Sequence, residues 1–262
     1  MGLELNNTYN MNCIDGMKQL PDNYIDLTVT SPPYDDLRNY NNTLNWNFEI
    51  FKKVAYELYR VTKIGGVVVW IVNDKTIKGS ESGTSFKQAL YFKEIGFNLH
   101  DTMIYKKDGC GACGSNKSYI QSFEYMFVFV KGKIKTYNLL YDRQNKKVVK
   151  TTTNGNRINR KGDKRTIETK QFGRRFNIWE YSTANQVVTK DKMAYRHPAI
   201  FPEQLAKDHI LSWSNEGDIV MDIFMGSGTT AKMCKLTNRN YIWLEISKEY
   251  SDIAEDRLNL LD

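Results

Sequence analysis

The chain has 262 residues, 41% of them hydrophobic, which is enough for one large domain or for one domain with a smaller insertion. Its longest strongly apolar run, residues 67–72, is too short to span a bilayer, and its first ten residues lack the basic and apolar segments of a signal peptide. Four cysteines in a chain of this length do not make a disulfide framework, so we expect a cytoplasmic protein without membrane contact.

The net charge of +7 is concentrated in one segment. Residues 131–175 contain fifteen Lys or Arg against three acidic residues, a net charge of +12, so the rest of the chain carries −5. A solvated basic loop is one interpretation of this segment. A surface that neutralises phosphates is the other, and the concentration of charge on an otherwise mildly acidic chain favours it.

The first half of the chain alternates strand and helix patterns. Residues 24–30 are rich in β-branched side chains and predict a strand, which leads into a polar, Asn-rich loop over 35–47. Apolar residues between Phe51 and Leu58 have the spacing of an amphipathic helix, and Gly65-Gly66 is expected to end that helix. The next predicted elements are a strand over 67–72, a helix over 86–95, and strands over 99–106 and 123–130.

Apolar periodicity weakens between residues 131 and 192, so we expect a separate module or long loops there, with ordered structure around 176–181. Regular patterns then return. They predict a helix over 202–213, a strand over 218–224, a helix over 229–236, a strand over 240–245 and a last helix with Ser247 as its candidate N-cap. Strands that alternate with helices predict an α/β fold with a doubly wound, mostly parallel sheet, which binds ligands beyond the carboxyl ends of its strands.

A glycine turn follows the predicted strand that ends near Asp222. Gly226 and Gly228 allow a sharp turn and bring backbone N–H groups close to a ligand, and Thr229-Thr230 opens the next helix. Glu245 ends the next strand, at about the distance where nucleotide-binding folds hold ribose hydroxyls. A structural turn and a surface acid are the alternatives. Since the turn contains no lysine, a nucleoside without phosphates fits it better than ATP or NAD.

A second segment, Ser31-Pro32-Pro33-Tyr34, follows the first predicted strand. Two prolines fix the backbone and remove two N–H donors, so carbonyl groups there can face a ligand without competing donors. The Ser31 hydroxyl and the flat Tyr34 ring suit a planar base that carries an exocyclic amine. A rigid turn between strand and loop is the alternative.

The two segments together resemble the DNA amino-methyltransferases that use S-adenosylmethionine. Thr30-Ser31-Pro32-Pro33-Tyr34 and Asp222-x-Phe224-x-Gly226-x-Gly228-Thr229-Thr230 carry the resemblance, in the order of the family's circularly permuted β-group. Cys13 to Tyr34 is similar to its amino-terminal segment, and His197 to Pro202 to a second cofactor segment. The resemblance implies a Rossmann-like methyltransferase sheet made of a catalytic half at 1–130 and a cofactor-binding half at 193–262, with a basic DNA-recognition insertion at 131–192.

The resemblance also implies roles for individual residues. The catalytic residues would be Ser31, Pro32, Pro33 and Tyr34. S-adenosylmethionine would be bound by Asn12, Cys13, Asp15, His197, Pro198, Phe201, Asp222, Phe224, Gly226, Gly228, Thr229, Thr230 and Glu245. Asn12 stands where the family often has Asp, so it can accept a hydrogen bond from the cofactor's adenine but brings no charge.

Double-stranded DNA is the expected partner. The candidate DNA-binding residues are Arg157, Arg160, Lys161, Lys164, Arg165, Arg174 and Arg175. An amine inside a duplex is reached only when its base is rotated out, and Tyr34 and an aromatic residue of 123–127 are candidate walls for that base. The aromatic run is alternatively part of the core. Within the family, Ser at the first catalytic position is usual for cytosine N4 and Asp for adenine N6, so Ser31 favours cytosine.

Several alternatives stay open at this point. They are adenine N6 methylation, methyl transfer to RNA or to a protein amide, and a catalytically silent DNA-binding module. A separate restriction endonuclease and a second copy of the chain are candidate partners. Cys110 and Cys113 have the spacing of metal ligands but no second pair, so we expect a glycine-rich loop and no metal.

Overall fold

The computed structural model describes residues 2–33, 46–108, 117, 119–148, 150–154, 164–168, 170–184, 187–200 and 202–261, with the backbone alone at 150–154 and 164–167. The chain divides into two compact units. The sheet unit comprises Met1–Asn138 and Asn177–Asp262, and the basic unit comprises Leu139–Phe176.

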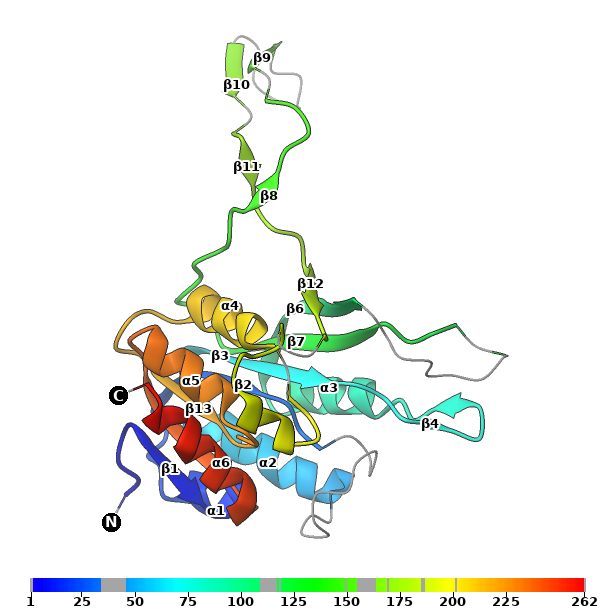
Figure 1. The fold of residues 1–262 in the computed structure, drawn as a ribbon. Helices are drawn as coiled ribbons and strands as arrows, with labels where there is room; N and C mark the ends of the chain where they lie inside the picture. Colours follow the sequence, from blue (N-terminus) through cyan, green and yellow to red (C-terminus); the bar gives the residue numbers. More distant parts are fainter. Residues whose placement is uncertain are drawn as a thin grey trace. The chain divides into compact units, whose positions relative to one another are not determined.

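An eight-stranded sheet forms the centre of the sheet unit (Figure 1). Its order is β1-β14-β13-β2-β3-β7-β6-β12, and neighbouring strands are parallel except β7, which is antiparallel to β3 and β6. The predicted doubly wound, mostly parallel sheet is therefore confirmed. The strands are β1 (Asn7–Asn10), β2 (Ile25–Thr30), β3 (Thr62–Val72), β6 (Phe97–Asp108), β7 (Phe123–Lys131), β12 (Ile178–Ser182), β13 (Ile219–Asp222) and β14 (Asn240–Glu245).

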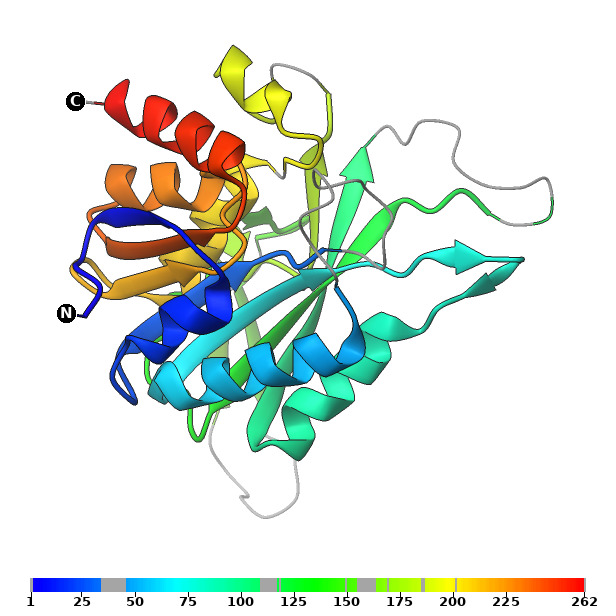
Figure 2. The same cartoon turned by 90° about the horizontal axis from the view of Figure 1, so that it is seen from below.

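Helices cover both faces of this sheet (Figures 1 and 2). One face carries α1 (Cys13–Lys18), α2 (Phe48–Val61) and α3 (Thr84–Glu94), and the other carries α4 (Glu203–Trp213), α5 (Thr229–Leu236) and α6 (Lys248–Asn259). A hairpin of β4 (Thr76–Ile77) and β5 (Ser80–Glu81) and a 3-10 helix, η1 (Lys192–Arg196), complete the unit. Among the described residues, no helix has the length and apolar character that a bilayer crossing requires.

The central strands are buried on both faces, as expected for strands between two helical layers. Residues 67–72 of β3 are apolar and almost fully buried, whereas β2 has Ile25, Leu27 and Val29 on one face and buried Thr28 and Thr30 on the other. Helix α2 begins where the Asn47 side chain accepts a hydrogen bond from the Ile50 amide, at 3.0 Å. Its predicted apolar face packs into the same core.

The prediction that Gly65-Gly66 ends helix α2 is wrong. The helix ends at Val61, and both glycines lie inside β3, next to a shift in register between β2 and β3. A Cβ on Gly66 would lie 2.9 Å from the carbonyl oxygen of Asp26, and Gly65 has a φ of +88°. The glycines are therefore needed where two strands approach closely and not as a helix stop.

The described part of the basic unit contains short antiparallel pairs. Strand β8 (Arg143–Gln144) pairs with β11 (Phe172–Gly173), and β9 (Lys150–Asn154) pairs with β10 (Lys164–Glu168). This unit is narrower than the expected insertion at 131–192, because residues 131–138 and strand β12 belong to the sheet unit. Strand β12 joins the sheet through parallel pairing with β6. The predicted ordered structure around 176–181 therefore corresponds to this strand.

Candidate active site

The two predicted site segments meet at the carboxyl edge of the sheet. Strands β2 and β13 are parallel neighbours, with Leu27 paired to Val220 and Thr28 to Met221. At their ends, the Thr30 hydroxyl donates a hydrogen bond of 2.6 Å to Asp222, a residue 192 positions away. Ser31 follows Thr30 directly, so the segment that begins with it starts beside the glycine turn.

The residues of the predicted catalytic segment differ in burial. Ser31 is half-buried at the end of β2, and Pro32 and Pro33 are buried behind it. Tyr34 lies outside the described residues.

Asp222 joins the two segments through a buried carboxylate. It accepts hydrogen bonds from the Thr30 hydroxyl and from the Phe224 amide, the latter at 3.1 Å. Burial raises the pKa of Asp222 to about 6, although these two donors act in the opposite direction. Asp222 therefore orders the start of the turn at a cost in desolvation.

Glu245 at the end of β14 holds the glycine turn from the adjacent strand. Its two carboxylate oxygens accept from the amides of Gly226, at 2.9 Å, and Ser247, at 2.8 Å. Burial raises the pKa of Glu245, and the Ser247 and Gly226 amides oppose that rise. The structure thus gives Glu245 a role in shaping the turn, in addition to the predicted contact with a ribose.

Both glycines of the turn are required by the protein's own packing. Gly226 has a φ of +53°, and a Cβ there would lie 2.9 Å from Nε2 of His197. Gly228 has a φ of +78°, and a Cβ there would lie 2.8 Å from the Cβ of Ala254 in α6. His197 also packs edge-on against the ring of Tyr250, with 4.3 Å between ring centres. The structure therefore brings the predicted His197 segment onto the glycine turn.

The amino-terminal segment lies at the same edge. Strand β1 pairs with β14, and Asn10 stands opposite Glu245. The Asn12 side chain caps helix α1 by accepting from the Ile14 amide at 2.9 Å. Desolvation, with a smaller contribution from the Glu245 charge, raises the pKa of the Cys13 thiol to about 12, so this thiol is neutral near pH 7. Asp15 is exposed in the first turn of α1.

An aromatic wall stands beside the turn and was not predicted. Phe224 contacts Trp46 edge-on at 5.3 Å between ring centres, and Trp70 at 6.3 Å. Trp46 is only 7% exposed, although it follows a polar segment in the sequence. In the predicted aromatic run of β7, Phe127 is part of the core, and Tyr125 stacks on it.

Two buried cations beside the turn were also missed. Lys232 of α5 and Arg257 of α6 are both buried and form ion pairs with Asp191 and Glu203. Since their charges are compensated inside the protein, they do not form a phosphate clamp. This donor set suits a cofactor without phosphates, as the turn sequence predicts. The remaining candidates on this side are buried Thr229 and Thr230, exposed Pro198, and Phe201, which lies outside the described residues.

The candidate DNA-binding residues belong to the basic unit. Arg174 is exposed, and Arg175 forms an ion pair with Asp142. The hydrogen bond from Arg175 lowers the pKa of Asp142. Lys164 and Arg165 lie in β10, where the backbone alone is described. Arg157, Arg160, Lys161, Cys110 and Cys113 lie outside the described residues.

A family model described as DNA methylase matches residues 25–256, which include both site segments. The chain belongs to the N6/N4 family of DNA methylases. The prediction of a DNA amino-methyltransferase is therefore confirmed.

A curated relative agrees with this assignment, and solved structures share the fold. The orphan methyltransferase M.BamHII of Bacillus amyloliquefaciens is 63% identical over 239 residues, which cover 89% of this chain and 88% of that protein. The PvuII cytosine-N4-specific DNA methyltransferase has a similar fold, with a TM-score of 0.73 at 19% identity over 98% of this chain and 87% of that one. A complex of M1.HpyAVI with S-adenosylmethionine has a TM-score of 0.64 at 21% identity, covering 96% and 98% of the two chains.

Proposed function

We propose that this methylase transfers a methyl group from S-adenosylmethionine to the N4 amine of a cytosine flipped out of duplex DNA. The hydrogen bond between Thr30 and Asp222 supports this proposal most directly. It joins the strand that leads into the amine-binding segment to the strand that leads into the cofactor turn. Both reactants can therefore be held at one edge of the sheet.

The cofactor would be held by the glycine turn and the elements packed around it. S-adenosylmethionine supplies an electrophilic methyl group on a positively charged sulfur. The carboxylate of Glu245 and the aromatic face of Phe224 suit a ribose and a sulfonium, respectively. The other candidate ligands are Asn12, Cys13, Asp15, His197, Pro198, Phe201, Asp222, Gly226, Gly228, Thr229 and Thr230.

The Ser31 segment would bind and activate the amine. An exocyclic amine is a poor nucleophile because its lone pair is delocalised into the ring. The Ser31 hydroxyl and the Pro32 carbonyl would each accept one amine hydrogen, which localises the lone pair on nitrogen. Most of the rate acceleration would come from positioning and from these fixed dipoles. The methylated amine would be cationic and acidic, so it would release its surplus proton to solvent.

The basic unit would bind the DNA backbone. It contains twelve Lys or Arg against three acidic residues, a net charge of +9, which is more than the net charge of the whole chain. Such an excess suits phosphate contacts, which position a protein on a duplex without reading its sequence. We further propose that the order of the segments is that of the family's permuted β-group, with this unit as the recognition insertion.

Cytosine is proposed over adenine because Ser occupies position 31, as in the cytosine-N4 enzymes that the segment resembles. The test is transfer of a tritiated methyl group to unmethylated duplex DNA and to RNA, with mass spectrometry of the nucleosides released. N4-methylcytosine from DNA alone is the expected product. N6-methyladenine would overturn the base assignment, and labelled RNA or unlabelled DNA would overturn the proposed substrate.

A further inference from the structure

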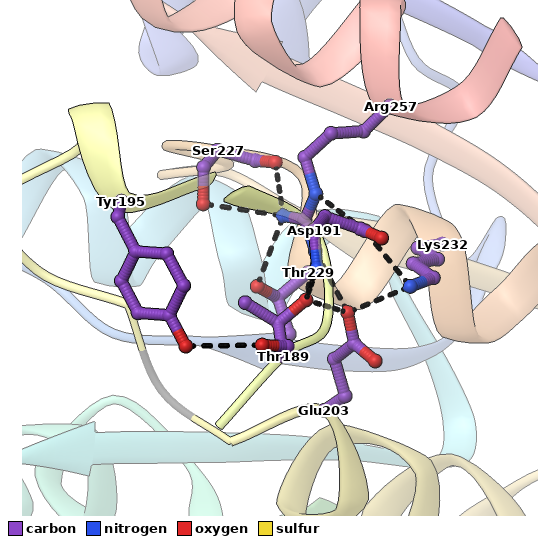
Figure 3. A network of polar contacts seen from close by, with 8 residues as sticks. All are labelled: Thr189, Asp191, Tyr195, Glu203, Ser227, Thr229, Lys232 and Arg257. Atoms are coloured by element: carbon purple, nitrogen blue, oxygen red, sulfur yellow. Dashed lines mark hydrogen bonds and ion pairs between the residues drawn. The ribbon is translucent and has the colours of Figure 1, made fainter. Parts of the chain in front are cut away.

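A buried cluster of charged side chains lies beneath the glycine turn. Its centre is Arg257 of α6, whose side chain has no exposed surface. The partners of Arg257 in Figure 3 come from two separate parts of the sequence, 189–203 and 227–229. The cluster consists of Thr189, Asp191, Tyr195, Glu203, Ser227, Thr229, Lys232 and Arg257.

One side of the Arg257 guanidinium faces the glycine turn. Its Nη1 donates to the backbone carbonyl oxygen of Ser227 at 2.5 Å, and it lies 3.3 Å from the Ser227 hydroxyl and 3.4 Å from the Thr229 hydroxyl. Ser227 stands between Gly226 and Gly228, both of which have positive φ angles. Arg257 therefore contacts the turn at the residue whose backbone both glycines orient.

The other side of the guanidinium faces the segment that carries His197. Its Nε donates to Asp191 at 3.1 Å, and its Nη2 donates to Glu203 at 2.9 Å. Lys232 donates to the same two carboxylates, in each case at 2.8 Å. Asp191 and Glu203 lie before and after His197 in the sequence, so the cluster anchors both ends of that segment.

The charges in the cluster balance, with two cations against two carboxylates. Burial alone would raise the pKa of Asp191, but hydrogen bonds from Lys232 and Arg257 hold it below the ordinary value. Such a buried network is weak evidence for stability, because well-packed apolar residues often replace one without loss. Arg257 in fact lies on the apolar face of α6 with Ile253, Ala254 and Leu258, where a hydrophobic residue would satisfy packing.

Helix α6 contacts the candidate cofactor site at three points on one face. Tyr250 packs on the His197 ring, Ala254 packs against Gly228, and Arg257 binds Ser227. The first two contacts are steric. The third is a directed hydrogen bond. The same Arg257 side chain also bonds Asp191 and Glu203, at the two ends of the His197 segment.

We propose that Arg257 is a positioning residue for the cofactor, because it holds the glycine turn and the His197 segment at a fixed spacing. This inference rests on the proposed function, in which S-adenosylmethionine binds between those two segments. Arg257 itself would not touch the reacting atoms. Its loss would weaken cofactor binding and leave the chemical step nearly intact once the cofactor is saturating.

The chain offers a matched control in a second buried arginine. Arg239 is 7% exposed and donates to the Ser214 hydroxyl and carbonyl and to the Thr237 carbonyl. It precedes the first residue of β14, whereas Glu245 and the glycine turn lie at the strand's other end. Arg239→Met therefore removes a comparable buried hydrogen-bonding group away from the candidate site.

The experiment measures the Kd of S-adenosylmethionine by isothermal titration calorimetry, together with the melting temperature, for wild type, Arg257→Met and Arg239→Met. Because a displaced turn would lose about one hydrogen bond to the bound cofactor, we expect Arg257→Met to raise the Kd about tenfold. At saturating cofactor its kcat should stay within about twofold of wild type. Arg239→Met should lower the melting temperature and leave the Kd unchanged.

Two results would overturn the inference. One is an unchanged Kd in Arg257→Met, and the other is an equal rise in Kd in both variants, which would indicate general destabilisation. If Arg257→Met fails to fold, Arg257→Lys decides, because one ammonium group cannot span Ser227 and Glu203 as the guanidinium does. A wild-type Kd in a stable Arg257→Lys variant would then refute the inference. Failure of the wild type to bind S-adenosylmethionine would instead refute the proposed function.

Discussion

The sheet unit and the basic unit use charged residues in opposite ways. The sheet unit carries a net charge of −2, and its buried cations Arg257 and Lys232 both pair with Glu203. The basic unit carries +9, with the ion pair between Arg175 and Asp142 as a local contact. Charge in the first unit organises buried contacts, whereas the twelve cations of the second outnumber the three acidic residues that could pair with them. Variants in the sheet unit should therefore alter methyl transfer, cofactor binding or stability. Variants in the basic unit should alter the salt dependence of DNA binding.

The largest effect is expected at Ser31. Ser31→Ala removes one of the two proposed acceptors for the amine and should lower kcat by about 10²–10³-fold, as loss of one preorganised polar contact does elsewhere. DNA affinity should stay within about twofold because phosphate contacts supply most of it, and so should the Kd of S-adenosylmethionine because Ser31 is proposed to contact the amine and not the cofactor. Single-turnover methyl transfer, gel-shift and calorimetric measurements check the three quantities. Undiminished methyl transfer would refute the role of Ser31.

A pH-dependent effect on stability is expected at Asp222. Because the folded protein holds the Asp222 proton up to about pH 6, while the unfolded chain releases it near pH 4, raising the pH across this interval favours unfolding. By about pH 7 the loss reaches about 3 kcal/mol in the free energy of unfolding. Asp222→Asn lacks this loss, so its stability relative to wild type should rise between pH 4 and pH 6 and then level off.

Urea denaturation at several pH values tests the Asp222 prediction. The free energy of unfolding is compared between wild type, Asp222→Asn and Asp252→Asn, an exposed control in α6. The control should follow the wild-type pH profile. A constant difference between Asp222→Asn and wild type over the whole range would contradict the assignment of a raised pKa to Asp222.

Sequence patterns predict the individual helices and strands of the sheet unit better than the contacts between them. Helix α5 and strand β14 have the predicted bounds, because each is a continuous apolar or amphipathic segment. Strand β1 and helix α1 were not predicted as elements, since four and six residues are too few for a clear period. The proximity of Ser31 to the glycine turn came from the order of parallel strands and from a family resemblance.

The Arg257 cluster shows what local patterns miss. Its members come from 189–203, 227–232 and 257, and no spacing in the sequence pairs them. The available signal was Arg257 itself, a charged residue on the apolar face of the last predicted helix, next to Leu258 and one turn after Ala254. A cation at such a position indicates a buried partner but does not identify it.

A smaller effect is expected from a side chain at Gly226. Gly217→Ala is the matched control, because Gly217 also has a positive φ, +82°, but no atom lies within 4 Å of its added Cβ. The control should cost about 1 kcal/mol of stability from backbone strain alone. Gly226→Ala should cost about 2 kcal/mol, since its Cβ also displaces His197, and it should weaken cofactor binding. Equal melting temperatures and equal Kd values in the two variants would contradict the close contact with His197.

The smallest effect separates the two units most directly. Lys146 and Lys147 are exposed in the basic unit, and Lys53 and Lys93 are exposed in the sheet unit. If the basic unit contacts phosphates, Lys146→Ala with Lys147→Ala should lower DNA affinity about tenfold and reduce the slope of log K against log salt by about 2. Lys53→Ala with Lys93→Ala removes the same charge and should leave that slope unchanged. Fluorescence anisotropy with labelled duplex DNA at several salt concentrations measures both slopes, and equal slopes would show that the two surfaces bind DNA alike.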